Sequence, residues 1–212
     1  MKDQLHHYIE KLIPQRESFF VEMEEYAVWH SVPIMEIVGM EALLQLLSLQ
    51  QPKKILEIGT AIGYSSLRMA TSLPNVEIVT IERDEKRIKD AKKYLTQHES
   101  GQRIHLIEGD ALEVSEMVLQ HGPFDALFID AAKGQYPKFF SLYAPMLKEE
   151  GVIYTDNVLF KGYVADIESI ESRNKRSLVK KIHQYNEWLM NHEKYKTAIL
   201  PVGDGLAITK KR

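Results

Sequence analysis

The chain has 212 residues, of which 44% are hydrophobic and 27% are charged, and its formal net charge at pH 7 is −3. This composition is typical of a globular protein with a sizeable core, and the apolar runs are too short to span a membrane. The charge argues against a protein that is basic all over, as many tight nucleic-acid binders are, but it permits a local basic patch. The sequence has no cysteine, which excludes disulfides, thiolate metal sites and cysteine nucleophiles. Any metal site must therefore use oxygen or imidazole ligands.

The first fifty residues are predicted to be helical. Apolar residues recur at spacings of three and four in "YIEKLIPQRESFFVEMEEYAVWH" and again in "IMEIVGMEALLQLLSL". Pro14 and Pro33 should divide this segment into two or three helices. The start, "MKDQLHHYIEKLIP", lacks the apolar segment and cleavage site of a secretion signal, so we expect a cytoplasmic protein.

From Lys53 onwards, short β-rich runs alternate with helical stretches. The runs are "KILEIG", "VEIVTIE", "RIHLIEG", "FDALFID" and "GVIYTD". The helices between them are predicted over residues 64–72, 85–98, 111–121 and 136–147. This alternation indicates a parallel sheet with right-handed crossovers, which is an α/β, Rossmann-like fold.

The C-terminal part is predicted to hold a long helix and a hairpin. The helix is expected from about residue 167 to residue 191, after a loop with Gly162. Two β runs flank "PVGDG" and predict an antiparallel hairpin with its turn at residues 203–205. We expect a single domain over residues 1–212, with a helical extension over 1–50 and a Rossmann-like core over 51–212.

A glycine-rich turn follows the first predicted strand. In "ILEIGTAIGYSS", Glu57, Gly59 and Gly63 stand where strand gives way to helix, so the backbone can approach a ligand closely. The G-x-x-x-G spacing differs from the G-x-G-x-x-G fingerprint of dinucleotide sites, which makes a pyrophosphate cofactor the weaker interpretation. Ser65 lacks the following glycine of a nucleophile elbow and is interpreted as a helix-start hydroxyl that can contact the ligand.

Acidic residues end the next two strands. Glu82 ends the second, where doubly wound folds place an acid that binds ribose hydroxyls. Asp110 and Ala111 follow the third, near the expected adenine position. Each acid alone could simply cap a helix, but the set favours a nucleoside with an amino acid and a positive sulfur. That cofactor is S-adenosylmethionine.

A second polar group follows the fourth and fifth strands. Asp130 follows the fourth, and Asp156 and Asn157 follow the fifth, so their side chains should converge beyond the carboxyl edge of the sheet. Two carboxylates and an amide oxygen form a hard, open site that suits magnesium, manganese or calcium. Lys133 would lose its proton more readily beside such a cation and could act as a general base. The alternative is that the aspartates cap helices and the lysine is a solvated loop charge.

The motifs "EIGTAIGYSS", "IERD", "EGDA", "FIDAAKGQY" and "YTDNV" together resemble the metal-dependent catechol and caffeoyl-coenzyme A type O-methyltransferases. The resemblance runs from about residue 33 to the terminal hairpin. It implies a seven-stranded class I methyltransferase fold, usually a homodimer, with Mg²⁺ or Mn²⁺ held by Asp130, Asp156 and Asn157. It implies catalysis by Lys133 as the base together with Asp130. The cofactor contacts that it implies are Met35, Glu57, Ser65, Glu82, Asp110, Ala111 and Asp130, with Gly59 and Gly63 shaping the turn.

Within that family the chain looks most like small bacterial members that methylate 5-hydroxyuridine at the wobble position of tRNA. The 5-hydroxyl and the 4-carbonyl of that base can chelate a metal as a catechol does. A tRNA would need basic contacts, and "SRNKRSLVKK" places Arg173, Arg176 and Lys180 on one helical face, with Lys161 beside the metal residues. A solvated face is the commoner explanation of such a helix.

The expected reaction is therefore in-line transfer of a methyl group from S-adenosylmethionine to a hydroxyl deprotonated by Lys133, forming 5-methoxyuridine in tRNA. Two alternatives stay open. One is the same chemistry on a small catechol or a hydroxycinnamoyl-coenzyme A ester. The other is a noncatalytic nucleoside- or RNA-binding protein.

Overall fold

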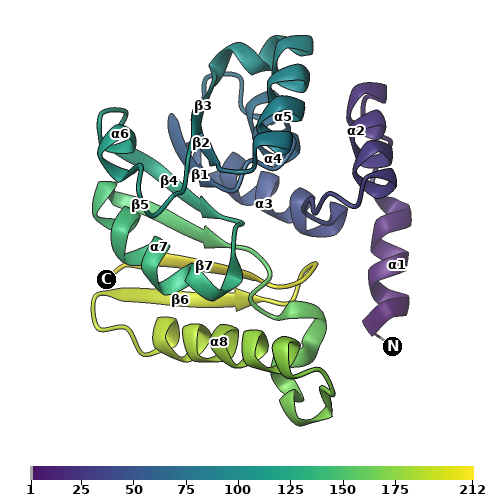
Figure 1. The fold of residues 1–212 in the computed structure, drawn as a ribbon, viewed down its shortest axis with the longest axis vertical. Helices are drawn as coiled ribbons and strands as arrows, with labels where there is room; N and C mark the ends of the chain where they lie inside the picture. Colours follow the sequence, from purple (N-terminus) through teal and green to yellow (C-terminus); the bar gives the residue numbers. More distant parts are fainter. Residues whose placement is uncertain (1) are drawn as a thin grey trace.

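The computed structural model describes the backbone of residues 2–212 and the side chains from Gln4 onwards. A seven-stranded sheet runs through the centre of the molecule in the order β3-β2-β1-β4-β5-β7-β6 (Figure 1). The strands are β1 (Lys54–Ile58), β2 (Glu77–Glu82), β3 (Ile104–Glu108), β4 (Phe124–Ile129), β5 (Leu147–Thr155), β6 (Tyr195–Leu200) and β7 (Leu206–Lys211). Neighbouring strands among β1 to β5 are parallel, whereas β7 is antiparallel to both β5 and β6. The predicted fold class is confirmed.

Helices cover both faces of this sheet. The α-helices are α1 (Lys2–Leu12), α2 (Ser18–Trp29), α3 (Ile37–Gln50), α4 (Tyr64–Ser72), α5 (Glu85–Gln97), α6 (Ser115–Leu119), α7 (Tyr136–Tyr143) and α8 (Arg173–Met190). One apolar core lies between the sheet and α2, α3, α4 and α5, and the other lies between the sheet and α6, α7 and α8. Covering on both faces explains why β1, β2 and β4 are almost wholly buried. None of the helices in residues 2–212 combines the length and the apolar character that a bilayer crossing requires.

The N-terminal segment, predicted to form two or three helices, forms three. Pro14 lies between α1 and α2, and Pro33 lies between α2 and α3. The helices predicted over residues 64–72 and 85–98 are also present as α4 and α5. Asp84 explains the start of α5, because its carboxylate accepts a hydrogen bond from the amide of Arg87 at 3.0 Å.

Three predicted helices are shorter than expected, and in each case a local feature explains the boundary. After β3, the carboxylate of Asp110 accepts the amide of Leu112 at 2.9 Å and holds a turn, so α6 begins only at Ser115. Helix α7 ends at Tyr143, before Pro145. Helix α8 begins at Arg173 because Ser172 caps it.

The terminal hairpin turns at the predicted glycines, with φ of +53° at Gly203 and +93° at Gly205. The turn docks on the segment after β5, where the amides of Leu159 and Phe160 donate to the Asp204 carbonyl at 2.9 and 3.0 Å. A Cβ atom on Gly205 would lie 2.7 Å from the backbone nitrogen of Leu159, so only glycine fits there. A short 3₁₀ segment, η4 (Phe160–Ala165), then leads towards α8.

Candidate active site

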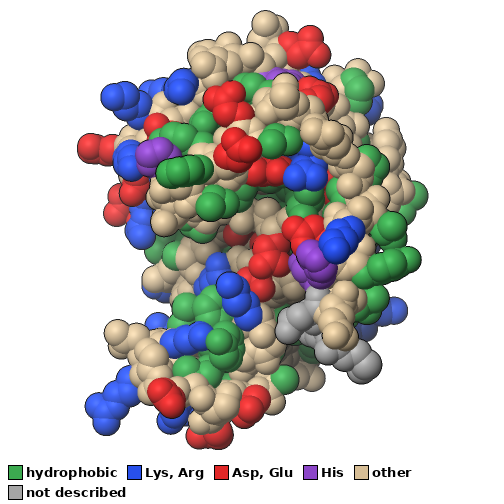
Figure 2. Space-filling model, turned by 90° about the vertical axis from the view of Figure 1, so that its right-hand side faces the viewer, with side chains coloured by type: hydrophobic (Ala, Val, Ile, Leu, Met, Phe, Trp, Pro, Cys, Tyr) green, Lys and Arg blue, Asp and Glu red, His purple; other side chains and the backbone are tan. Residues whose placement is uncertain are grey.

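A cavity of about 650 Å³ opens at the carboxyl edge of the parallel strands. Its walls come from the turns after β1 to β5, from the hairpin turn and from the connection between α2 and α3. Figure 2 looks onto this edge of the sheet, where acidic side chains gather around the hollowed centre of the face. The predicted site residues that line the cavity are Met35, Gly59, Ser65, Glu82, Asp110, Ala111, Asp130, Lys133, Asp156 and Asn157. Ligands of open α/β sheets bind at this edge.

The turn after β1 fits closely against the end of β4. Gly59 has a φ of +103°, and a Cβ atom there would collide with the carbonyl oxygen of Asp130. Gly63 has a φ of +86° and precedes the first residue of α4 without lining the cavity itself. The two glycines therefore shape the turn, as predicted, and leave Ser65 facing the cavity.

Glu57 lies behind the residues that line the cavity, so its expected contact with the cofactor stays a prediction. Its fully buried carboxylate accepts hydrogen bonds from Ser65 at 2.5 Å, from Thr80 at 2.6 Å and from Ser66. Burial raises the pKa of Glu57 to about 7, although the three hydroxyl donors oppose the rise. Glu57 thus acts on the cavity by orienting the Ser65 hydroxyl.

Hydrogen bonds to Glu82 connect the turn after β1 to the turn after β2. Its two carboxylate oxygens accept backbone amides of Ala61 at 2.9 Å, Arg83 at 2.9 Å and Asp84 at 3.0 Å. These hydrogen bonds fix the carboxylate at the cavity. The oxygen that accepts only the Ala61 amide still has capacity for a ribose hydroxyl.

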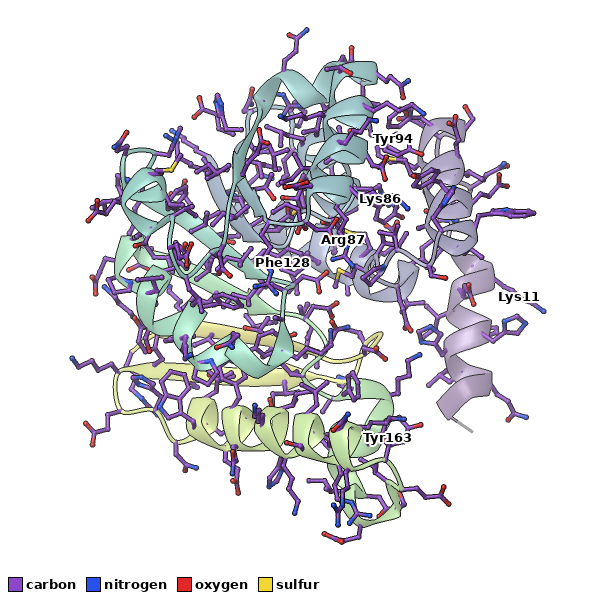
Figure 3. All side chains as sticks on the ribbon, viewed as in Figure 1. Lys11, Lys86, Arg87, Tyr94, Phe128 and Tyr163 are labelled. Carbon is purple, nitrogen blue, oxygen red and sulfur yellow. The ribbon has the colours of Figure 1, made fainter. Side chains whose placement is uncertain are left out.

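Asp110 and Ala111 lie on the far side of Glu82. The amide of Leu112 and the guanidinium of Arg83, at 2.8 Å, hold the pKa of Asp110 below its ordinary value. The carbonyl of Ala111 accepts the Tyr143 hydroxyl at 2.5 Å, which fixes this part of the wall from behind. Arg87, in the first turn of α5, also faces the cavity (Figure 3).

The structure brings Asp130, Lys133, Asp156 and Asn157 together at the other end of the cavity. The Lys133 ammonium donates to the side-chain oxygen of Asn157 at 2.6 Å. Asn157 has a left-handed φ of +58°, which asparagine tolerates better than most residues. These side chains come from two strand ends that the parallel pairing of β4 and β5 places side by side.

The donor set fits a divalent cation. Burial raises the pKa of Asp130 and raises the pKa of Asp156 well above its ordinary value, with repulsion between the two adding to the effect on Asp156. The buried Asp156 and the partly buried Asp130 face one ammonium, so a cation would relieve an excess of negative charge. No group of three His, Cys, Asp or Glu side chains within residues 4–212 could hold a metal by itself. A cation here would therefore need the Asn157 oxygen, with water or substrate in the remaining positions.

Some cavity residues were missed by the sequence analysis. Asp204 lies in the hairpin turn, and its motif "PVGDG" signals only a turn. Gln135 also lines the cavity, next to predicted residues. Lys161, which was expected beside the metal residues, lines the cavity together with Phe160 and was not missed. Phe160 and Lys161 have left-handed φ angles of +44° and +56°, a strain that sequence patterns do not show.

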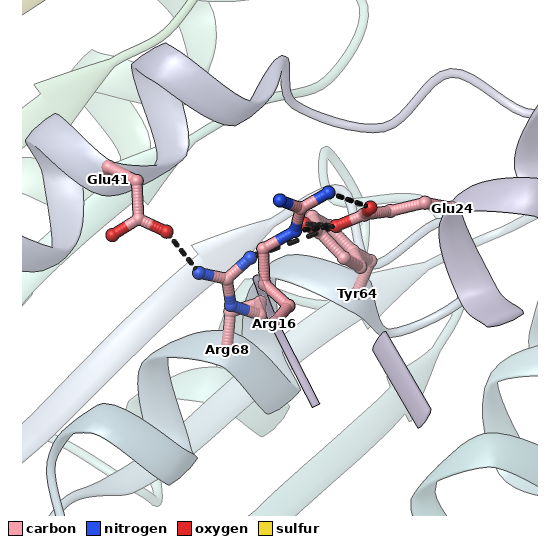
Figure 4. Close-up of polar contacts among 5 residues, drawn as sticks. All are labelled: Arg16, Glu24, Glu41, Tyr64 and Arg68. Atoms are coloured by element: carbon pink, nitrogen blue, oxygen red, sulfur yellow. Dashed lines mark hydrogen bonds and ion pairs between the residues drawn. The ribbon is translucent and has the colours of Figure 1, made fainter. Parts of the chain in front are cut away.

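A charged network links the N-terminal helices to the cofactor turn (Figure 4). Glu24 of α2 accepts from Arg16 at 2.6 and 3.0 Å and from the Tyr64 hydroxyl at 2.5 Å. Arg68 donates to that hydroxyl at 2.7 Å and to Glu41 of α3 at 2.5 Å. Burial would raise the pKa of Glu24, but the hydrogen bonds from Arg16 and Tyr64 hold it below its ordinary value. Because Tyr64 lines the cavity, the network anchors the helices beside the site.

Comparison with known proteins places the chain in a family. The model of an O-methyltransferase family matches residues 13–212. A catechol O-methyltransferase from Niastella koreensis is 31% identical over 170 residues, which is 78% of this chain and 77% of that protein. A caffeoyl-CoA O-methyltransferase from Petroselinum crispum is 28% identical over 99% of this chain and 91% of its own length.

Solved structures agree with this assignment. A Staphylococcus aureus protein, provisionally assigned as a caffeoyl-CoA O-methyltransferase, is 41% identical with a TM-score of 0.89 and covers 100% of this chain and 99% of its own. A Bacillus cereus O-methyltransferase solved with S-adenosylhomocysteine has a TM-score of 0.84 and 24% identity, with 100% of both chains covered. The fold is thus the class I methyltransferase fold, and the chain belongs to the O-methyltransferase family of the catechol and caffeoyl-CoA type.

Proposed function

We propose that the chain transfers the methyl group of S-adenosylmethionine to one hydroxyl of an acceptor with two adjacent oxygens, with the help of Mg²⁺ or Mn²⁺. The observation that supports this most strongly is the shared cavity. Its β1–β3 end offers a nucleoside site, and its β4–β5 end offers two acids, an amide oxygen and a lysine. A donor and an acceptor bound at the two ends would meet in the same cavity.

The β1–β3 end is assigned to the cofactor. Glu82 would accept a ribose hydroxyl, and Asp110 and Ala111 would border the adenine. Gly59 and Ser65 would face the methionine part. Met35, from the connection between α2 and α3, would cover the cofactor. The Bacillus cereus O-methyltransferase solved with S-adenosylhomocysteine supports the choice of cofactor for this fold.

The β4–β5 end is assigned to the acceptor and the cation. Asp130, Asp156 and Asn157 would hold the cation, which when bound would acidify the acceptor hydroxyl and bind both adjacent oxygens. Lys133 is held against Asn157 at 2.6 Å, and as a neutral amine it would keep that hydrogen bond and take the hydroxyl proton on its lone pair. The cofactor would supply the methyl group: the acceptor oxygen would bond to the methyl carbon as the carbon–sulfur bond breaks, which would give a methyl ether and S-adenosylhomocysteine.

The names of the relatives favour a small aromatic acceptor. They act, by name, on catechol and on caffeoyl-CoA, so they support a catechol or a hydroxycinnamoyl ester better than they support tRNA. Phe160 lines the cavity and could stack on such a ring.

The charge around the cavity supports 5-hydroxyuridine in tRNA as a second candidate. Lys161 lines the cavity, and the Lys175 ammonium lies 3.4 Å from the centre of the Tyr163 ring, near the start of α8. Lysine and arginine side chains gather on the lower part of the face in Figure 2. Arg176, by contrast, is engaged with the Ile170 carbonyl at 2.9 Å. A polyanion would benefit from such a surface, whereas a small neutral catechol would not.

One experiment tests the reaction and separates the acceptors. The protein is incubated with labelled S-adenosylmethionine and either catechol, caffeoyl-CoA or tRNA that contains 5-hydroxyuridine. We expect label in at least one acceptor, loss of transfer with EDTA and recovery with Mg²⁺ or Mn²⁺. Transfer that survives EDTA would refute the metal requirement. Label in none of the three would favour a noncatalytic binding protein.

A further inference from the structure

The end of β5 is held from behind by side chains of α7 and α8. The Tyr136 hydroxyl donates to the Asp156 carbonyl at 2.9 Å, and the Asn186 side-chain nitrogen donates to the Val158 carbonyl at 2.7 Å. Between them lies Asn157. Tyr136 is fully buried and Asn186 is 9% exposed, and neither lines the cavity. These two side chains therefore act on the site only through the backbone.

The two hydrogen bonds flank a residue with a left-handed backbone conformation. Asn157 has a φ of +58°, a region that the surrounding structure must stabilise. On the other side of the segment, the Val158 amide donates to the Gly205 carbonyl at 3.1 Å. The segment from Asp156 to Val158 is thus held by hydrogen bonds on both sides, from the terminal hairpin and from the two helices.

Tyr136 also connects the two strand ends that carry the proposed cation ligands. It is the first residue of α7 and stands three positions after Lys133, in the loop that follows Asp130. Its hydrogen bond to Asp156 therefore ties the loop after β4 to the end of β5. A shift of either loop would change the spacing of Asp130, Asp156 and Asn157.

We propose that Tyr136 and Asn186 are positioning residues that set the geometry of a divalent-cation site, an inference that rests on the proposed function. Mg²⁺ in particular tolerates little departure from octahedral geometry. A buried carbonyl that loses its donor must shift or stay unsatisfied, and either outcome disturbs the ligand beside it. Groups that orient metal ligands from outside typically contribute about 10–100-fold to metal affinity.

The test uses Tyr136→Phe, which removes one hydroxyl and preserves the buried ring. Mn²⁺ binding to the full chain is measured by electron paramagnetic resonance, without cofactor or acceptor. We expect the dissociation constant for Mn²⁺ to rise roughly tenfold. The Mg²⁺ concentration for half-maximal methyl transfer should rise by a similar factor, while the rate at saturating Mg²⁺ and the affinity for S-adenosylhomocysteine change less than about twofold. Asn186→Leu should shift Mn²⁺ affinity in the same direction.

Tyr154→Phe is the matched control. Tyr154 lies near the end of β5, two residues before Asp156, and is 2% exposed. Its hydroxyl donates to Gln50 at 3.0 Å on the other side of the sheet. A purely structural role would lower the melting temperature of both tyrosine variants and leave Mn²⁺ affinity unchanged in both. That result, with normal Mn²⁺ binding by the wild type, would overturn this inference alone. Absence of Mn²⁺ binding by the wild type would overturn the proposed metal site and this inference with it.

Discussion

The two ends of the cavity differ in how far their acidic groups are already satisfied. At the cofactor end, Glu57 accepts three hydroxyl groups and Glu82 accepts three backbone amides. The β4–β5 end, which we assign to the acceptor and the cation, is called the metal end here. At this end, neither the Asp130 nor the Asp156 carboxylate accepts a side-chain hydrogen bond from the described residues, and burial raises the pKa of both acids. The protein thus satisfies the acids at the cofactor end with its own hydrogen-bond donors, but at the metal end it leaves negative charge for a cation to balance.

The largest expected effect is at the metal end and concerns Lys133. Replacing Lys133 by Ala removes the group that takes the acceptor proton, so kcat for methyl transfer should fall by about 10²–10⁴-fold. Cofactor binding should survive, because the cofactor end keeps its own hydrogen bonds. Single-turnover transfer and calorimetry with S-adenosylhomocysteine measure the two quantities. A rate near that of the wild type would show that the lysine is not the base.

The next effect concerns Glu57 and the pH dependence of stability. Because its pKa in the folded state is raised from 4.5 to about 7, its contribution to stability is full below pH 4.5 and is lost as pH rises through about 7. The shift corresponds to roughly 3 kcal/mol. The difference in unfolding free energy between Glu57→Gln and the wild type should move in favour of the variant by about that amount over this range. Urea unfolding in EDTA at several pH values measures this difference in unfolding free energy. A difference that is independent of pH would contradict a raised pKa of Glu57 in the folded state.

Metal addition should stabilise only a protein with both aspartates. At about 100 times its dissociation constant, Mg²⁺ should raise the unfolding free energy by about 2.7 kcal/mol. For a chain of this size, that corresponds to a rise in melting temperature of roughly 5–10 °C. Asp156→Asn should lose most of this rise. An equal rise in the variant would mean that Mg²⁺ binds elsewhere.

The smallest effect is expected for the charged network of α2, α3 and α4. Glu24→Gln weakens the contacts with Arg16 and Tyr64, which are partly exposed, so we expect a loss of about 1 kcal/mol in stability. Cofactor affinity should fall by a few fold, because the segment with Met35 is held less firmly. Glu25→Gln, on the exposed side of the same helix, is the control. Equal cofactor affinities in the two variants would show that the charged network does not affect cofactor binding.

The sheet and most of the site could be predicted because their signals are local. The five β runs, the turn glycines and the hairpin follow from patterns a few residues long, and parallel strands must bring Asp130 and Asp156 to one edge. Helix ends were less accurate, since Asp110 and Ser172 hydrogen-bond to nearby amides and move the boundaries.

Contacts between distant segments could not be predicted. The sequence does not show that the Glu57 carboxylate hydrogen-bonds to Ser65 and Thr80. This contact depends on the register between β1 and β2, which places Glu57 opposite Thr80. The sequence also does not show that Asp204 reaches the cavity, or that Tyr136 and Asn186 hold the end of β5. These features depend on packing, which no single sequence pattern encodes.

The most direct measurement is anomalous diffraction from crystals grown with Mn²⁺ and S-adenosylhomocysteine. We predict one manganese peak between the side-chain oxygens of Asp130, Asp156 and Asn157, with the nucleoside beside Glu82. A map without manganese at that place, from a crystal that holds the nucleoside, would refute the proposed metal site.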